Sequence, residues 1–370
     1  MNIESGLPMD LFQHGHEQTL GKSRRRATGS HYTDLDLALE VVRATLEPIF
    51  AAAWTQSRHC VEAYTHEIRN LKILDPAMGA GHLLLVAWVE LAREIAYAEL
   101  TGSLRSSTYF EYIAAPEAWS GMPNRGAMDA RVVELLPSCA RCIYGVDLVP
   151  ETVEVARGNF MALAQTSATN LRCGNSLFGS TKCEAESIQD PFDTVFGQAS
   201  DTDPWDEAFY AAYGSRRITN LFHWEREFPD VKFDAVIANP PFLGDRSLRG
   251  VFGEDGVQYL SRRYSDGAVV DLCGYFVLKL TEWLHEDRGV AGLIVTNSLA
   301  QGKIRVKVLV PLVAGPSPKF EIYRSCRSRD WPGDASVHIA TIHMRRAGRT
   351  ALAVSPRRIV QVFPGDESQT

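Results

Sequence analysis

Two short segments of this chain combine residue types that suit chemistry on a planar amine. The first, FDAVIANPPFLG at 233–244, runs from alternating apolar positions into Asn239, Pro240, Pro241 and Phe242. Two consecutive prolines remove two backbone donors and fix two φ angles, so a strand must end there in a rigid turn. The Asn239 side-chain carbonyl and the backbone carbonyl before the second proline can then accept from one amino group. The Phe242 ring can stack against a planar base.

Such a pair of acceptors favours the pyramidal, nucleophilic form of a conjugated amine in a transition state. The amine then needs an electrophilic carbon close by and in line, which a sulfonium methyl group would supply. The second segment, DPAMGAG at 75–81, suits such a donor, because its small residues let the backbone approach a ligand at a helix N-terminus. No metal, nucleophilic side chain or strong base is required, and we expect no metal site.

Two further polar residues follow expected strands. Asp147 ends the apolar stretch CIYGVD, where a carboxylate can bind both hydroxyls of a ribose or cap the helix that begins near Pro150. Asn175 follows the stretch NLRC, where its amide can pair with an adenine edge or stabilise a turn. The residues alone leave both pairs of interpretations open.

The elements that must position these residues alternate between strands and helices from residue 71 onward. This alternation predicts an α/β fold with a mostly parallel sheet covered on both faces. Ahead of it, apolar residues at helical spacing predict a helix of about three turns, with Thr33 or Asp34 as its cap and Pro48 near its end.

The composition is that of a globular protein, with 370 residues of which 45% are hydrophobic and 22% charged. No apolar stretch approaches the roughly 20 residues that span a bilayer, and the N-terminus lacks the layout of a signal peptide. The seven cysteines are irregularly spaced, which favours reduced thiols. We therefore expect a cytoplasmic protein with no membrane partner.

The net charge of −7 is unevenly distributed along the chain. Residues 1–240 carry 20 Lys and Arg against 32 Asp and Glu, a net −12, whereas residues 241–350 carry 16 against 11, a net +5. A polyanion would be met by this basic part. An ordinary solvated surface with an acidic insertion explains the same numbers.

The segments DPAMGAG, YGVD, GNSL and NPPF, in this order and spacing, resemble the γ-type N6-adenine DNA methyltransferases that use S-adenosylmethionine. More narrowly, the segments FHWEREFP, DLCGYFVLKLTEWL, TNSLAQG and RSRDWPG resemble the Eco57I-type restriction-modification methylases and related phage-defence methylases of BREX and DISARM systems. The resemblance covers about residues 28–345. It implies a Rossmann-like class I S-adenosylmethionine-dependent methyltransferase fold with a seven-stranded sheet, and transfer of a methyl group to adenine N6 in DNA.

The resemblance also implies residue roles. Asn239, Pro240, Pro241 and Phe242 would hold the target base. The cofactor-binding residues would be Tyr32, Thr33, Asp75, Pro76, Gly79, Gly81, Asp147 and Asn175. The chain departs from the family pattern at several positions: Met78, Ala80 and His82 in the glycine turn, Asp34 in place of a common Pro, and Asn175 in place of the usual Asp. A neutral amide still accepts from an amino group, so we expect weaker cofactor binding rather than none.

We expect a basic N-terminal arm at 1–27, a catalytic domain at 28–350 with insertions near 101–138 and 179–230, and a tail at 351–370. We expect no target-recognition domain, so base readout in double-stranded DNA with a flipped adenine would need a recognition subunit or a defence-complex partner. Two alternatives stay open. The same residues suit methyl transfer to RNA or a protein glutamine, and the chain could instead be a non-catalytic DNA-binding subunit of a defence complex.

Overall fold

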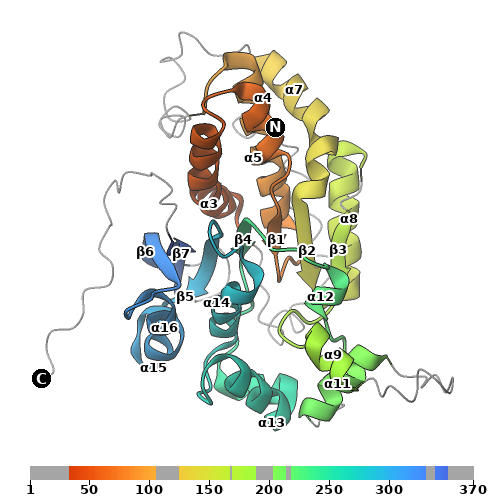
Figure 1. Cartoon of the computed structure of the whole chain (residues 1–370), viewed down its shortest axis with the longest axis vertical. Helices are drawn as coiled ribbons and strands as arrows, with labels where there is room; N and C mark the ends of the chain where they lie inside the picture. Colours follow the sequence, from red (N-terminus) through yellow and green to blue (C-terminus); the bar gives the residue numbers. More distant parts are fainter. Residues whose placement is uncertain are drawn as a thin grey trace, which may run out of the picture.

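The computed structural model describes residues 33–105, 125–166, 169–188, 203–213, 218–330 and 338–348. Within these ranges seven strands form one sheet in the order β3-β2-β1-β4-β5-β7-β6 (Figure 1). The strands are β1 Ile73–Asp75, β2 Ile143–Asp147, β3 Asn170–Cys173, β4 Ala235–Ala238, β5 Val290–Thr296, β6 Phe320–Asp330 and β7 His338–Arg346.

The sheet is mostly parallel, which confirms the predicted fold class. Strand β1 pairs in parallel with both β2 and β4, and the parallel part is extended by β3 on one side and β5 on the other. Strand β7 runs antiparallel between β5 and β6. The chain reverses its direction of strand addition between β1 and β4, and ligands bind at such a switch point beyond the carboxyl ends of the strands.

Helices cover both faces of the sheet (Figure 1). One face packs against α3 Leu35–Gln56, α4 Val61–Ile68, α5 His82–Thr101, α7 Arg125–Cys139 and α8 Pro150–Ala164. The other packs against α13 Asp245–Tyr264 and α14 Leu272–Trp283. Alternation along β4 shows the cause, because Ile237 joins the first core and Val236 joins the second. A strand buried on both faces reads as the continuous apolar run that the sequence shows.

The helix α3 is longer than predicted. It runs from Leu35 to Gln56, so the prediction that it ends near Pro48 is wrong. Pro48 cannot donate to the carbonyl of Ala44 four residues earlier, and an unsatisfied carbonyl there would be costly. The Tyr323 hydroxyl on β6 donates to that carbonyl instead, at 2.9 Å. A tertiary contact therefore lets the helix continue through its proline.

The two expected insertions contribute helices to the fold. In the first, α7 packs along α5, where the Trp88 indole donates to the carbonyl of Leu136 at 2.8 Å. The second contains α9 Lys182–Ile188, α11 Pro204–Tyr213 and α12 Trp224–Glu227. The arm at 1–27 and the tail at 351–370 lie outside the described residues.

Short elements precede β2 and follow β5. A 3-10 turn, η2 Ala140–Cys142, leads into β2, and β5 continues into η3 Asn297–Ala300, α15 Gly302–Ile304, the π-helical turn η4 Arg305–Leu309 and α16 Val310–Val313. Across the ranges that the structure describes, we find no helix with the length and apolar character to cross a membrane.

Candidate functional site

A cleft lies beyond the carboxyl ends of β1 to β4, with about 920 Å³ of empty space including its open mouth. The sequence-predicted residues that line it are Thr33, Asp75, Pro76, Gly79, Asp147, Asn175, Asn239 and Pro241. Both chemically suggestive segments of the sequence, about 160 residues apart, therefore face one space.

The glycine turn after β1 has a backbone that favours glycine at two positions. Gly79 has φ 54° and Gly81 has φ 85°, both in the left-handed region. A Cβ atom on Gly81 would lie 3.2 Å from the ring of Phe160 on α8, so helix α8 packs closely against the turn. Gly81 precedes α5, whose N-terminus faces the cleft through His82 and Leu83.

Asp147 at the end of β2 fixes this turn from the neighbouring strand. Its Oδ2 accepts from the Gly79 N–H and its Oδ1 accepts from the Val149 N–H, each at 2.9 Å. Asp147 does not cap α8, because the N-cap position is Val149; its carboxylate instead holds the turn that precedes the helix, and it also lines the cleft. Carboxylate oxygens can accept about four hydrogen bonds, so ligand hydroxyls can still be bound.

Asp75 is almost fully buried, with 2% of its surface exposed. Its pKa is raised to about 8, chiefly by burial and also by the nearby charge of Asp147, while the Ala77 N–H, which donates to Oδ1 at 3.0 Å, opposes the shift. Burial also raises the pKa of Asp147. In the described parts of the chain no Lys or Arg forms an ion pair with either carboxylate. The cleft thus holds two carboxyl groups whose ionised forms lack a cationic partner there, which favours a ligand that brings positive charge.

Asn175 lies in the loop 174–180 that follows β3. Its Oδ1 accepts from the Leu177 N–H at 3.2 Å, and its own N–H donates to the carbonyl of Asn220 at 2.7 Å. The turn-stabilising interpretation is therefore confirmed. Asn175, Ser176 and Leu177 also line the cleft, so this loop forms its wall beside β3.

Asn239 follows β4, the strand beside β1, and lines the same cleft as the glycine turn. Its Nδ2 donates to the Oγ1 of Thr33 at 3.0 Å, which holds the amide in place. Thr33 is held in place because Asp34 caps α3, with Oδ1 accepting from the Asp36 N–H at 3.0 Å. Asp34, which stands where the resembled pattern commonly has proline, therefore has a structural role as the cap of α3. Tyr32 lies outside the described residues.

The two prolines end β4 as predicted, with Pro240 buried and Pro241 at the cleft. Phe242 is half-buried and packs against both cores, and it is not among the cleft-lining residues. Its stacking on a base stays a prediction. The aromatic rings that line the cleft are Phe252 of α13 and Phe276 of α14.

Sequence reasoning missed these two rings and Leu148. Leu148 directly follows Asp147 and has 38% of its surface exposed, which is a usable signal for a ligand contact. Phe276 lies in an apolar helix where nothing in the pattern separates it from core residues. Phe252 lies just before Gly253, whose φ of 68° breaks α13.

The part of the cleft near Asn239 and the proline turn is held in place by Asp271, the cap of α14. Its Oδ2 accepts from the hydroxyl of Thr296, the last residue of β5, at 3.0 Å and from that of Ser298, just beyond the strand, at 2.7 Å. The next residue, Leu272, donates its N–H to the carbonyl of Leu243, just after the proline turn, at 2.9 Å. The loops after β4 and β5 are therefore both anchored at the start of α14.

Comparisons with known proteins agree with this arrangement. Residues 141–308 match the family model described as Eco57I restriction-modification methylase, a range that includes Asp147, Asn175 and Asn239. A curated protein of Methanocaldococcus jannaschii, named as a candidate type II restriction enzyme and methyltransferase, is 23% identical over 203 residues, covering 43% of this chain and 15% of that protein.

A solved structure shows the same fold. The type IIL restriction-modification enzyme MmeI, determined in complex with DNA, aligns with a TM-score of 0.52 at 15% identity, covering 93% of this chain and 40% of that chain. This chain therefore spans less than half the length of these two relatives. The strand order and this likeness identify the Rossmann-like class I S-adenosylmethionine-dependent methyltransferase fold.

Proposed function

We propose that this protein transfers a methyl group from S-adenosylmethionine to the N6 amino group of adenine in DNA, within a restriction-modification or phage-defence system. The observation that carries the proposal is the single cleft that holds Asp75, the glycine turn and Asp147 on one side and Asn239 with Pro241 on the other. The methylase family match and the methyltransferase fold support it.

The cofactor side of the cleft suits S-adenosylmethionine in charge and shape. The sulfonium and ammonium groups of this cofactor bring the positive charge that the carboxylates of Asp75 and Asp147 lack among the described residues. Asp147 can accept from ribose hydroxyls, and the turn at Gly79 and Gly81 brings the backbone close to the ligand. When bound, the cofactor would supply an electrophilic methyl group.

The other side of the cleft would hold and activate the acceptor amine. The Asn239 amide is oriented by Thr33, and the Pro240–Pro241 turn fixes the backbone carbonyl beside it. Two oxygens placed in advance would accept the hydrogens of the exocyclic amine and stabilise its pyramidal form as the new bond develops. The proton lost from nitrogen requires no strong base in this arrangement.

The charge distribution along the chain and the proteins to which it is similar favour DNA as the substrate polymer. Residues 241–350, which begin at the second proline of the turn, carry a net +5, whereas residues 1–240 carry a net −12. Basic side chains on the target-base side would neutralise phosphates and contribute salt-dependent affinity. The solved relative MmeI is described in complex with DNA, and the candidate relative is named as a restriction enzyme and methyltransferase.

The test is a transfer assay with tritiated S-adenosylmethionine and duplex DNA, followed by digestion to nucleosides. We expect label in N6-methyladenine. The matched variant Asn239→Ala should abolish transfer and leave the cofactor Kd within about twofold, since this side chain contributes acceptors to the base rather than to the cofactor. Label that appears in RNA or in a glutamine-containing peptide but not in DNA would replace the proposed substrate. A chain that binds no cofactor, with Asp75 and Asp147 intact, would favour a non-catalytic DNA-binding subunit.

A further inference from the structure

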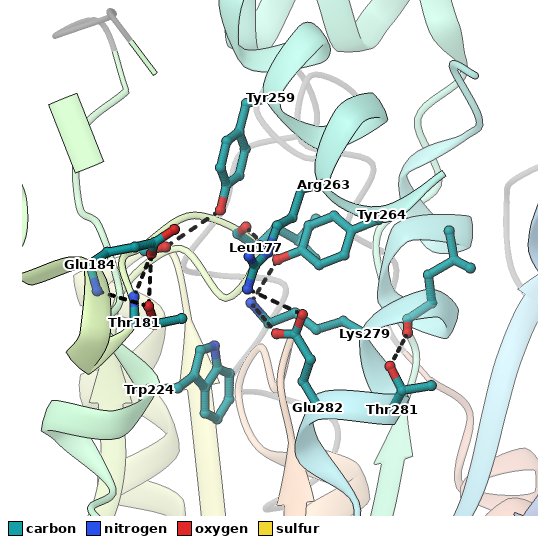
Figure 2. Close-up of polar contacts among 12 residues, drawn as sticks. Leu177, Thr181, Glu184, Trp224, Tyr259, Arg263, Tyr264, Lys279, Thr281 and Glu282 are labelled. Atoms are coloured by element: carbon teal, nitrogen blue, oxygen red, sulfur yellow. Dashed lines mark hydrogen bonds and ion pairs between the residues drawn. The ribbon is translucent and has the colours of Figure 1, made fainter. Parts of the chain in front are cut away.

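A buried polar chain links helix α14 to the loop 174–180 (Figure 2). The Lys279 Nζ donates to the Tyr264 hydroxyl at 2.9 Å, and that hydroxyl donates to the carbonyl of Leu177 at 3.2 Å. Lys279 has only 5% of its surface exposed. Figure 2 shows the Tyr264 hydroxyl between Lys279 and Leu177, and Leu177 lines the cleft.

A lysine is a costly choice for this buried position. Burial lowers the pKa of Lys279, and its nearest opposite charge, on Glu282, is 3.6 Å away and also serves Arg263 at 3.5 Å. The rings of Tyr264 and Trp283, at 5.3 and 5.8 Å, add cation–π attraction. An apolar side chain of similar length would fill the same space without desolvating a charge. A structural role alone therefore does not account for the lysine.

The chemistry of the ammonium group explains what the lysine adds. A tyrosine hydroxyl can act as donor or acceptor, and its hydrogen can rotate to suit its neighbours. An ammonium group carries donors and no acceptor, so it occupies the lone pair of the Tyr264 oxygen and leaves the hydroxyl hydrogen for Leu177. The side chains of Arg263 and Tyr259 also hydrogen-bond the Tyr264 hydroxyl, so Lys279 is one of the groups that set the direction of its bond to Leu177.

Side chains from other elements also bind backbone carbonyls of the loop 174–180. The Trp224 indole of α12 donates to the carbonyl of Ser176 at 3.0 Å, and the Tyr259 hydroxyl of α13 donates to that of Gly179 at 3.4 Å. The Ser176 hydroxyl in turn donates to the carbonyl of Pro76 in the glycine turn at 2.5 Å. The conformation of this cleft wall is therefore set from outside the cleft.

We propose that Lys279 is a positioning residue for the cofactor: through Tyr264 it fixes the carbonyl of Leu177 and so the wall formed by Asn175, Ser176 and Leu177. This inference rests on the proposed function, because it assigns that wall to the cofactor side of the cleft. Asn239, which donates to Thr33 at 3.0 Å, follows a different strand, β4. Because Lys279 acts on the wall that follows β3, it should affect cofactor affinity more than the transfer step.

The experiment compares Lys279→Met and Tyr264→Phe with wild type in calorimetric titration with S-adenosylmethionine and in steady-state transfer to DNA. Each variant should weaken cofactor binding about fivefold to tenfold, the effect of one lost hydrogen bond. The KM for the cofactor should rise by the same factor, with kcat at saturating cofactor within about twofold. The double variant should bind no more weakly than either single variant, because the two side chains act in one chain.

Glu282→Gln is the matched control. It removes a charge partner of Lys279 and leaves both hydrogen-bonding partners of Tyr264 in the protein. A cofactor Kd within about twofold of wild type would show that these hydrogen bonds, and not the ion pair, carry the effect. Thermal unfolding of every variant shows whether it is folded. If Lys279→Met proves unstable, Tyr264→Phe still tests the inference, because it keeps the packing of the ring. Variants that lose stability but bind the cofactor like wild type would overturn the inference, as would additive losses in the double variant. Wild-type protein that binds no cofactor would overturn the proposed function as well, which distinguishes the two failures.

Discussion

Replacement of Asp75 by Asn tests the electrostatics of the cleft directly. Its folded pKa of about 8 lies above the ordinary value of 3.8, because the side chain is buried beside Asp147. A carboxyl group with a raised folded pKa contributes stability that is fully present below the unfolded pKa and is lost as pH rises through the folded pKa. Wild-type stability should therefore fall between about pH 4 and pH 8 from this group.

The size of the effect follows from the same pKa. Between pH 5 and pH 9 the folded protein must give up this proton while the unfolded chain has already lost it. About three pKa units at 1.36 kcal/mol each give a loss of about 4 kcal/mol, to within a factor of two. Asp75→Asn removes this titration. Urea unfolding at several pH values should therefore show that the free energy of unfolding of the variant, relative to wild type, rises by about this amount across the range. Parallel curves for the two proteins would refute the reasoning.

The same residue predicts proton release on cofactor binding. At pH 7 a group with a pKa of about 8 is roughly nine-tenths protonated. A bound cation beside it lowers the pKa and drives the proton off, so titrations in buffers of different ionisation enthalpy should show close to one proton released per cofactor. The Asp75→Asn variant should release almost no proton from this site and should bind the cofactor more weakly. Equal proton release by the two proteins would show that the proton comes from another group.

Other substitutions separate the parts of the site. Gly81→Ala should lower stability by about 1–2 kcal/mol in urea unfolding and weaken cofactor binding, because φ at this position is 85°; an unchanged Kd would contradict the role of the turn. Thr33→Val should lower kcat for DNA about tenfold with little change in cofactor Kd, because it frees the Asn239 amide. Tyr323→Phe should cost about 1–3 kcal/mol of stability through the carbonyl of Ala44, with cofactor binding unchanged as the check that the effect is remote.

The sequence predicts the sheet and its carboxyl-end loops well because local chemistry marks them. Strand β2 ends at Asp147 and α8 begins at Pro150 as predicted, since proline is tolerated in a first helical turn. Helix α3 was predicted too short because the partner of its unsatisfied carbonyl lies 279 residues away in the sequence. No local pattern can reveal such compensation.

The residues that line the cleft also divide into those that local chemistry marks in the sequence and those that it does not. Asp147 and Asn239 were visible because polar groups at strand ends contrast with the apolar strands before them. Phe252 and Phe276 were not, because an aromatic residue in a helix has the same signature whether it faces a core or a ligand. The contacts that hold the loop 174–180 were also invisible, since Trp224, Tyr259 and Tyr264 bind backbone carbonyls, which every residue carries.

These contacts divide the cleft into two halves that are held by different parts of the chain. The cofactor half depends on α12, α13 and α14 through the loop 174–180, and on Asp147 through the glycine turn. The base half depends on the N-terminal cap of α3, through Thr33, and on Asp271 at the start of α14. Because a substitution acts most strongly on the geometry it contacts, we expect changes in the first half to appear mainly in cofactor affinity and changes in the second half mainly in turnover. Helix α14 contacts both halves, through Lys279 on the proposed cofactor side and Asp271 on the proposed base side, so a displacement of this helix should alter both at once.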